Sequence, residues 1–174
     1  MSINHTKIYY NFKKLTTDHI TEDYISWLNN PIINEFLQVK NKIQTKKTVS
    51  DFIQSFDGLE EKYIWGIYHK DKMVGTTTLS FFNKTENSAE IGLMIGDTNY
   101  WGKLASDSAF KFVLNFAFNT LEKDSVTGTC YDTNIGIIFT FKKLGFVRER
   151  LRYINDTPMH QWRITSEKNR LLSC

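Results

Sequence analysis

The chain has 174 residues, of which 41% are hydrophobic and 14% aromatic, so we expect one domain with a packed core over residues 1–174 and no extended disorder. Its net charge of +3, from 22 basic and 19 acidic residues, is too small and too evenly spread to indicate a nucleic-acid partner. The two cysteines form neither a disulfide framework nor a zinc-type pattern, so we expect a reduced protein with no metal. No run of residues is apolar enough to span a membrane or to form the core of a signal peptide, so we expect a cytoplasmic location.

The N-terminal part of the sequence favours one strand followed by helices. Hydrophobic alternation predicts a strand over residues 7–13. A helical face over residues 20–28 follows a cap at Thr17 or Asp18, and the sequence Asn-Asn-Pro at 29–31 ends it. A short helix is then expected over residues 33–37, and another from Thr48 to Gly58.

From residue 63 onward the hydrophobic period changes to two, which predicts a sheet. A hairpin is expected from strands at 63–68 and 73–79, and a third antiparallel strand at 89–95. The remaining elements are a helix at 105–117, a strand at 126–131, a helix at 135–144 ended by Gly145, and closing strands at 146–147 and 161–164. This mixed order predicts an α+β domain and excludes a doubly wound sheet.

The loop at residues 99–105 joins the 89–95 strand to the helix that follows it. Backbone N–H groups at the start of a helix have no partner within the helix, and the helix dipole attracts negative charge there. A glycine-containing loop in this position is therefore typical of an anion site. The sequence predicts a cofactor that carries phosphate.

Three segments, in this order, carry a resemblance to a known family. They are Ala-Glu-Ile-Gly at 89–92, Tyr-Trp-Gly-Lys-Leu at 100–104, and the stretch from Asn134 to Lys-Leu-Gly-Phe at 143–146. Together they resemble the GNAT acyl-CoA-dependent N-acetyltransferases, in the branch that includes the ribosomal-protein alanine acetyltransferases. The similarity covers nearly the whole chain. It implies a mostly antiparallel central sheet with helices on both faces and two strands that splay apart for acyl-CoA, often beside a bulge.

The resemblance also implies which residues hold acetyl-CoA as co-substrate. The pantetheine arm would pair with backbone groups of Leu93, Met94 and Ile95, and Asn134 would reach it. The pyrophosphate would lie on the loop formed by Asn99, Tyr100, Trp101, Gly102, Lys103, Leu104 and Ala105. The chain departs from the family pattern at three of its positions. Asn99 replaces a longer Gln or Arg, Leu104 replaces a small residue, and Ile137 stands where the branch often has a Ser proposed to protonate the leaving thiolate.

Acetyl transfer to an amine needs a base for the amine and an acid for the departing sulfur. We expect Glu90 to be the base, directly or through a water, and Tyr131 to be the acid. The alternatives are a solvent-facing strand glutamate and an aromatic on a half-buried strand. Cys130 is either an acyl carrier or, as free cysteines more often are, a small buried side chain. Lys142 and Lys143 either meet the 3′-phosphate of the cofactor or form a solvated helix end.

The acceptor is the least defined part of the sequence-based prediction. The segment 27–34, with Trp27, Asn30 and Asn34, resembles one found in some acetyltransferases of nucleotide-linked amino sugars, so we expect these residues to bind the acceptor. The alternative is a corner between helices with a buried Trp and capping Asn side chains. We expect a small-molecule amine, an amino sugar either free or nucleotide-linked, as substrate of a monomer or homodimer. The alternatives are a protein N-terminus of ribosomal-protein type and a CoA-binding module without turnover.

Overall fold

The structure is a computed structural model that describes residues 8–58, 61–83, 85–154 and 156–172. In these residues seven strands form a single sheet in the order β1-β2-β3-β4-β5-β7-β6. The strands are β1 Asn11–Lys14, β2 Lys62–His69, β3 Lys72–Asn83, β4 Ser88–Ile95, β5 Ser125–Cys130, β6 Val147–Ile154 and β7 Thr157–Thr165. The helices are α1 Glu22–Asn29, α2 Lys46–Gln54, α3 Ala105–Asn119, α4 Ile135–Lys143 and α5 Ser166–Leu172, with 3₁₀ turns at Thr17–His19 and Thr98–Tyr100.

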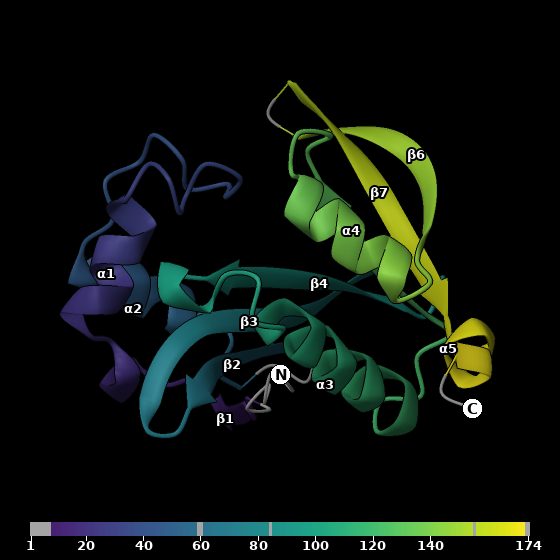
Figure 1. Cartoon of the computed structure of the whole chain (residues 1–174), viewed down its shortest axis with the longest axis horizontal. Helices are drawn as coiled ribbons and strands as arrows, with labels where there is room; N and C mark the ends of the chain where they lie inside the picture. Colours follow the sequence, from purple (N-terminus) through teal and green to yellow (C-terminus); the bar gives the residue numbers. More distant parts are fainter. Residues whose placement is uncertain (1–7, 59–60, 84, 155, 173–174) are drawn as a thin grey trace, which may run out of the picture.

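The sheet opens between its two central strands. Strands β1 to β4 pair antiparallel in chain order, and β5, β7 and β6 form a second antiparallel group. The two groups are joined by the parallel pair β4 and β5, whose register covers only Ser88 to Glu90 opposite Ser125 to Thr127. Beyond Glu90 the strands part, and Figure 1 shows β7 and β6 rising away from β4. The expected splayed pair is therefore present, while the β3–β4 register runs without a shift from Gly75 to Ser80.

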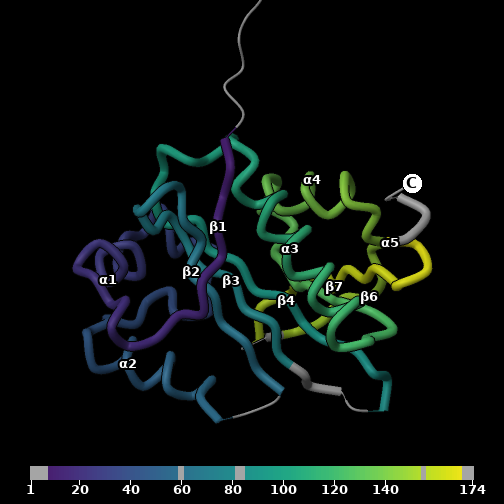
Figure 2. The backbone as a smooth tube through the Cα atoms, turned by 90° about the horizontal axis from the view of Figure 1, so that it is seen from below, coloured from purple at the N-terminus to yellow at the C-terminus, as the bar shows by residue number. Residues whose placement is uncertain are grey.

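Helices cover both faces of the sheet. In Figures 1 and 2, α1 and α2 lie at one side and α3 and α4 at the other. Ala89 and Ile91 of β4 belong to the cluster that includes side chains of α3 and α4, whereas Met94 packs with Trp27 of α1. Because side chains alternate along a strand, Glu90 faces the same side of the sheet as Met94, away from α3. The α+β fold class with helices on both faces is confirmed.

Most predicted elements lie where the hydrophobic period placed them, and the differences have local causes. The first helix begins after Thr21, whose side chain accepts the N–H of Tyr24, because residues 17–19 form a 3₁₀ turn instead. The next helix starts at Lys46 after the cap Thr45, and Thr48 is the partner of that cap. The short helix predicted at 33–37 is wrong, since this segment forms successive turns.

Three further differences concern the ends of the chain. The first strand begins only at Asn11, and residue 7 of the predicted strand lies outside the described residues. The closing strand β6 runs on to Ile154, far beyond the predicted 146–147, and α5 was not predicted.

None of the described helices has the length and hydropathy needed to cross a membrane. Within the described ranges, no three His, Cys, Asp or Glu side chains are grouped so that they could hold a metal ion.

Candidate active site

The splayed part of β4 presents unpaired backbone groups to the gap. The carbonyl of Ala89 accepts a hydrogen bond from the Thr127 hydroxyl on β5, at 3.4 Å, and the carbonyl of Gly92 accepts one from Thr77 on β3, at 2.9 Å. Since successive residues point their backbone groups to opposite sides of a strand, Leu93 and Ile95 face the gap. Met94 is two residues from Gly92, so its backbone groups face β3 as those of Gly92 do, and we propose only Leu93 and Ile95 as partners of the pantetheine arm.

The end of this free edge is partly covered by Trp101. Its indole Nε1 donates to the Ile95 carbonyl at 2.8 Å, and the side chain is 47% exposed. Trp101 therefore holds the β4–α3 loop against the end of β4 by a bond to one of the groups expected to meet the pantetheine arm. Leu93 remains as the free backbone position between this contact and the closed end of the gap.

Glu90 lies at the point where β4 and β5 part. Its carboxylate accepts a hydrogen bond from the Thr129 hydroxyl of β5 at 3.2 Å and forms an ion pair with Arg152 of β6 at 3.5 Å. The side chain is 24% exposed, so it is neither a plain surface residue nor a core residue. Two donors from two other strands thus orient the carboxylate while lone pairs remain on its oxygens for a substrate proton.

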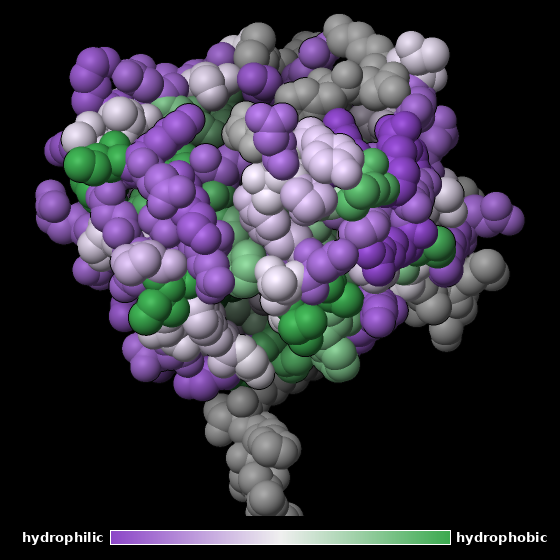
Figure 3. All heavy atoms as spheres, turned by 90° about the horizontal axis from the view of Figure 1, so that it is seen from above, coloured by the Kyte–Doolittle hydropathy of each residue, from purple (hydrophilic) through white to green (hydrophobic). Residues whose placement is uncertain are grey.

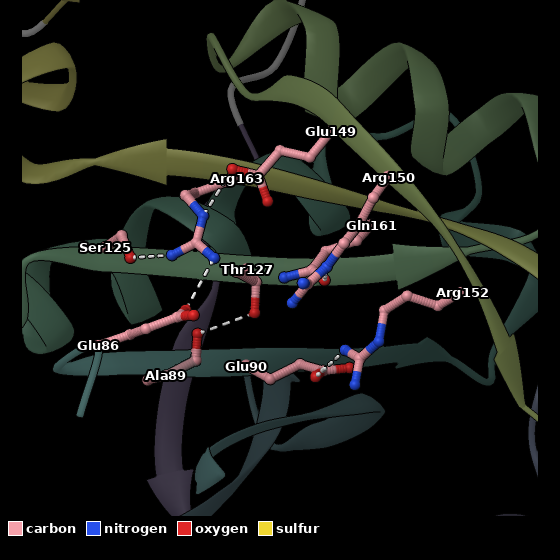
Figure 4. Close-up of polar contacts among 10 residues, drawn as sticks. All are labelled: Glu86, Ala89, Glu90, Ser125, Thr127, Glu149, Arg150, Arg152, Gln161 and Arg163. Atoms are coloured by element: carbon pink, nitrogen blue, oxygen red, sulfur yellow. Dashed lines mark hydrogen bonds and ion pairs between the residues drawn. The ribbon is translucent and has the colours of Figure 1, made fainter. Parts of the chain in front are cut away.

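A polar cavity of about 160 Å³ adjoins this carboxylate. It is lined by Glu86, Ser88, Ala89, Glu90, Thr127, Arg150, Arg152 and Gln161. Figure 4 shows Arg150 and Arg152 reaching from β6 toward Gln161 and Glu90, with Arg163 and Glu86 at the other end. In the view from above in Figure 3, hydrophilic residues cover much of both sides of the molecule, and hydrophobic residues are visible in the hollow between them. The polar side chains that line the cavity suit a ligand rich in hydroxyl groups or charge.

The β4–α3 loop turns through two left-handed positions before α3 begins. Gly102 has φ +71°, and Leu104 has φ +62° as the N-cap of α3, with a side chain that is 59% exposed. The N–H groups of Leu104, Ala105, Ser106 and Asp107 make no hydrogen bond with the described part of the chain. These donors at a helix N-terminus fit a pyrophosphate.

Asp97 fixes the start of this loop. It is buried, accepts bonds from both the N–H and the side-chain amide of Asn99 at 3.0 and 2.9 Å, and pairs with Lys72 at 2.7 Å. Burial raises the pKa of Asp97, but the bonds from Lys72 and Asn99 outweigh it and lower the pKa below its usual value. Both the side-chain amide and the backbone N–H of Asn99 are therefore turned back to Asp97, and neither donor is directed at a phosphate.

Aromatic side chains anchor the middle of the loop to the sheet. The Tyr100 hydroxyl lies 2.8 Å from His69 Nδ1 on β2, and the Tyr10 hydroxyl donates to the Lys103 carbonyl at 2.8 Å. The rings of Tyr10 and Tyr100 also meet edge to face. Tyr100 thus supports the loop, whereas the exposed Lys103 side chain lies over the Tyr100 ring at the surface where a phosphate would approach.

The other side of the gap is formed by the end of β5 and the start of α4. Asn134 is the N-cap of α4, and its Oδ1 accepts the N–H of Ile137 at 3.3 Å, which leaves its amide group for a ligand. Tyr131 follows β5, and its ring lies 6.0 Å from that of Phe36 in the 30–44 segment. Tyr131 is therefore placed at the gap between the two sides of the molecule, off the strand on which we expected it.

Two further side chains near the gap have structural partners. Lys143 forms an ion pair with Asp107 in the first turn of α3 and so links α4 to α3. Cys130 is buried, which raises the pKa of its thiol to about 11. A thiol that stays protonated is a poor nucleophile, so Cys130 fits the small-buried-residue alternative.

The residues expected to bind the acceptor form a corner instead. Trp27 is buried against Tyr24 and stacks so closely over Gly96 that a β-carbon there would lie 2.1 Å from its ring. Asn34 is buried and donates to the Leu28 carbonyl at 2.8 Å, and Asn30 accepts the N–H of Ile32 at 2.9 Å. Trp27 is thus a packed residue of α1, and the two asparagines bond within the turn that follows this helix.

Sequence reasoning missed the polar residues contributed by β6 and β7, namely Arg150, Arg152 and Gln161. The run Arg-Glu-Arg-Leu-Arg at 148–152 has arginine at alternate positions, which indicates a strand with its arginines on one face. That signal was available, but only the fold brings this strand beside Glu90.

Comparison with known proteins gives a consistent picture. The family model described as an acetyltransferase (GNAT) domain matches residues 11–147. No curated protein matches the sequence.

Solved structures of similar fold include spermidine N-acetyltransferase from Vibrio cholerae in complex with CoA and spermine. It has a TM-score of 0.79 and 15% identity over 92% of this chain and 97% of that chain. The ribosomal L7/L12 α-N-protein acetyltransferase RimL, in complex with CoA, has a TM-score of 0.79 and 10% identity over 91% and 95%. A domain from Methanocaldococcus jannaschii has a TM-score of 0.76 and 20% identity over 91% and 99%. At these identities the likeness concerns the fold.

Proposed function

The chain belongs to the GNAT acetyltransferase family and is an N-acetyltransferase with acetyl-CoA as donor, and we propose that it acetylates the primary amine of an amino sugar, free or nucleotide-linked. The observation that carries this proposal is Glu90, oriented by Thr129 and Arg152 at the closed end of the gap beside a polar cavity. Hydroxyl and amide groups of Ser88, Thr127 and Gln161 in that cavity suit the hydroxyl groups of a sugar.

The donor fits the residues that are present. Acetyl-CoA supplies an activated thioester when bound, and the free backbone position Leu93, the Asn134 amide and the N–H groups at the start of α3 are the groups we propose to hold it. Leu93 would pair with the pantetheine arm, and the α3 N-terminus would bind the pyrophosphate. Asn134, at the α4 N-terminus, would fix the arm between the two strands.

In the proposed reaction the amine attacks in a ternary complex. Glu90 accepts the proton from the amine nitrogen as that nitrogen bonds to the acetyl carbon, and the C–S bond then breaks. Tyr131, at the other side of the gap, protonates the departing sulfur and is later reprotonated from solvent, while Glu90 releases the amine proton to solvent. Ile137 has no proton to donate, so Tyr131 takes over the role that the branch often gives to a Ser there.

The test is Glu90→Gln, measured as CoA release with glucosamine, a nucleotide-linked amino sugar and a peptide with a free N-terminus. We expect kcat to fall about 10²- to 10⁴-fold, the usual contribution of a general base, while calorimetry shows unchanged acetyl-CoA affinity. The matched control is Glu149→Gln, since Glu149 also pairs with an arginine, Arg163, at 2.7 Å but does not line the cavity.

Three results would contradict the proposal. Glu90→Gln with wild-type kcat would remove Glu90 from the chemistry. Turnover of the peptide alone would favour the protein N-terminal alternative. Tight acetyl-CoA binding without transfer to any amine would favour the binding module.

A further inference from the structure

Strand β6 contains a bulge beside the cavity. Its register with β7 runs Val147 to Arg163 and Arg148 to Trp162, and then resumes at Leu151 opposite His160. Glu149 and Arg150 therefore lie opposite the single residue Gln161. A bulge of this kind turns the following side chains to the other face of the strand.

The bulge separates arginines that the sequence spaces evenly. Arg148 bonds Asp132 and His160, outside the cavity, at 3.1 and 2.7 Å. Arg150 and Arg152 instead line the cavity. The guanidinium groups of Arg150 and Arg152, two residues apart on β6, thus face the space beside Glu90, as Figure 4 shows.

Three arginines and three glutamates lie in or beside the cavity, but they do not form three separate ion pairs. Arg163 pairs with both Glu86, at 3.1 Å, and Glu149, at 2.7 Å, and Arg152 pairs with Glu90. Arg150 forms no ion pair with any described residue; its Nε donates to the Gln161 side-chain oxygen at 3.1 Å. The acidic side chains of the cavity therefore pair directly with other arginines, and the guanidinium of Arg150 has no carboxylate in direct contact among the described residues.

Gln161 holds Arg150 in place for a ligand. Gln161 is 3% exposed, so its side chain is fixed by packing, and its bond to Nε leaves the two terminal nitrogens of Arg150 directed elsewhere. A guanidinium has five N–H donors in a planar fork that matches the two oxygens of a carboxylate or phosphate. An oriented guanidinium whose terminal nitrogens have no carboxylate partner is suited to recognition of such an anion.

From this we infer that the acceptor amine carries an anionic oxygen group, phosphate or carboxylate, and that Arg150, positioned by Gln161, is the residue that selects it. The inference rests on the proposed function and narrows its substrate to anionic amino sugars.

The test compares three amino sugars: glucosamine, glucosamine 6-phosphate, and muramic acid, which carries a carboxylate. Each is titrated calorimetrically into the CoA-saturated wild-type protein and into Arg150→Gln, and each is also assayed for acetylation. The matched control is Arg148→Gln, on the same strand but on the other side of the bulge. Saturation with CoA prevents the ligand phosphate from binding at the cofactor site.

We expect the wild-type protein to bind one of the two anionic sugars more tightly than glucosamine, and the better of the two identifies phosphate or carboxylate. Arg150→Gln should weaken that binding about 10- to 100-fold, as for loss of a charge-assisted bond, and raise KM with little change in kcat. Arg148→Gln should keep the preference.

Equal binding of the three sugars, or an anion preference that survives Arg150→Gln, would overturn the inference. These results are distinct from failure of the proposed function. Acetylation of glucosamine that depends on Glu90 but not on Arg150 would overturn only the anion inference. Absence of acetylation of any amine would count against the proposed function, and the binding titrations would still decide the role of Arg150.

Discussion

Replacing Leu104 by glycine should stabilise the protein, although it removes a large hydrophobic side chain. Leu104 is the N-cap of α3 at φ +62°, and its side chain is 59% exposed and makes no cap bond. The left-handed conformation costs an L-residue with a β-carbon about 1–2 kcal/mol. Little buried area is lost on truncation, so relief of this backbone cost dominates the folded-state effect.

The magnitude follows from setting that relief against the unfolded state. Glycine has more conformational freedom when unfolded, which costs about 0.5–1 kcal/mol. The difference between these two ranges spans about 0–1.5 kcal/mol, and its central part gives an expected net gain in the free energy of unfolding for Leu104→Gly of about 0.5–1 kcal/mol. For a chain of this size, each kcal/mol shifts Tm by about 2–4 °C, so we expect a rise of about 1–4 °C.

The same change should tighten acetyl-CoA binding. Removal of the β-carbon and its isobutyl group leaves the N–H groups at the start of α3 open to a closer approach of phosphate. Thermal unfolding and calorimetric titration with acetyl-CoA measure the two effects. The matched control is Leu104→Ala, which removes the isobutyl end but keeps the β-carbon and hence the backbone cost. A lower Tm for Leu104→Gly, or an equal rise for both variants, would refute the reasoning.

Two other predictions concern packing and the buried thiol. Gly96→Ala places a β-carbon 2.1 Å from ring atoms of the buried Trp27, so thermal unfolding should show a free energy of unfolding lower by about 1–3 kcal/mol. The control Gly136→Ala, in α4 with no neighbour nearer than 4.0 Å, should not destabilise the protein. An unchanged stability of Gly96→Ala would contradict the contact with Trp27. In a Cys174→Ser background, Cys130 should react with a thiol reagent at pH 8 about a hundredfold more slowly when folded, because a pKa raised from 9.0 to about 11 reduces the thiolate fraction by that factor. Equal alkylation rates of the folded and unfolded protein would exclude this raised pKa. The same shift should make the free energy of unfolding fall as pH rises from about 9 toward 11, since the protonated thiol favoured by the fold is then lost.

The fold was largely predictable because its elements follow from local patterns. The period-two runs gave the hairpin of β2 and β3 and the strand β4, and the apolar stripe gave α3. Caps were less predictable, since Thr16, Thr21 and Thr45 are all followed by residues able to start a helix. Which threonine caps depends on whether its side chain finds an N–H group after packing, and the sequence does not contain that information.

The candidate site was predictable where function depends on backbone and less so where it depends on side chains. The loop before α3 was located from Gly102 and the start of a helix, because that anion site is made of N–H groups. Asn30, Asn34 and Asn99 are polar residues suited to a ligand, yet their side chains bond to the chain itself. Residue type shows what a side chain can bond to, while the fold decides whether an intramolecular partner has already taken it.

The arginines of β6 show why the acceptor side could not be derived from spacing alone. Arg148, Arg150 and Arg152 are each two residues apart, so an unbroken strand would put all three on one face. The register shift between Arg148 and Leu151 moves Arg148 to Asp132 and His160 and turns the other two toward Glu90. One extra residue in one strand therefore determines which guanidinium groups can meet a substrate. For that reason Arg148→Gln and Arg150→Gln, alike in sequence and in charge, should differ in their effect on an anionic acceptor.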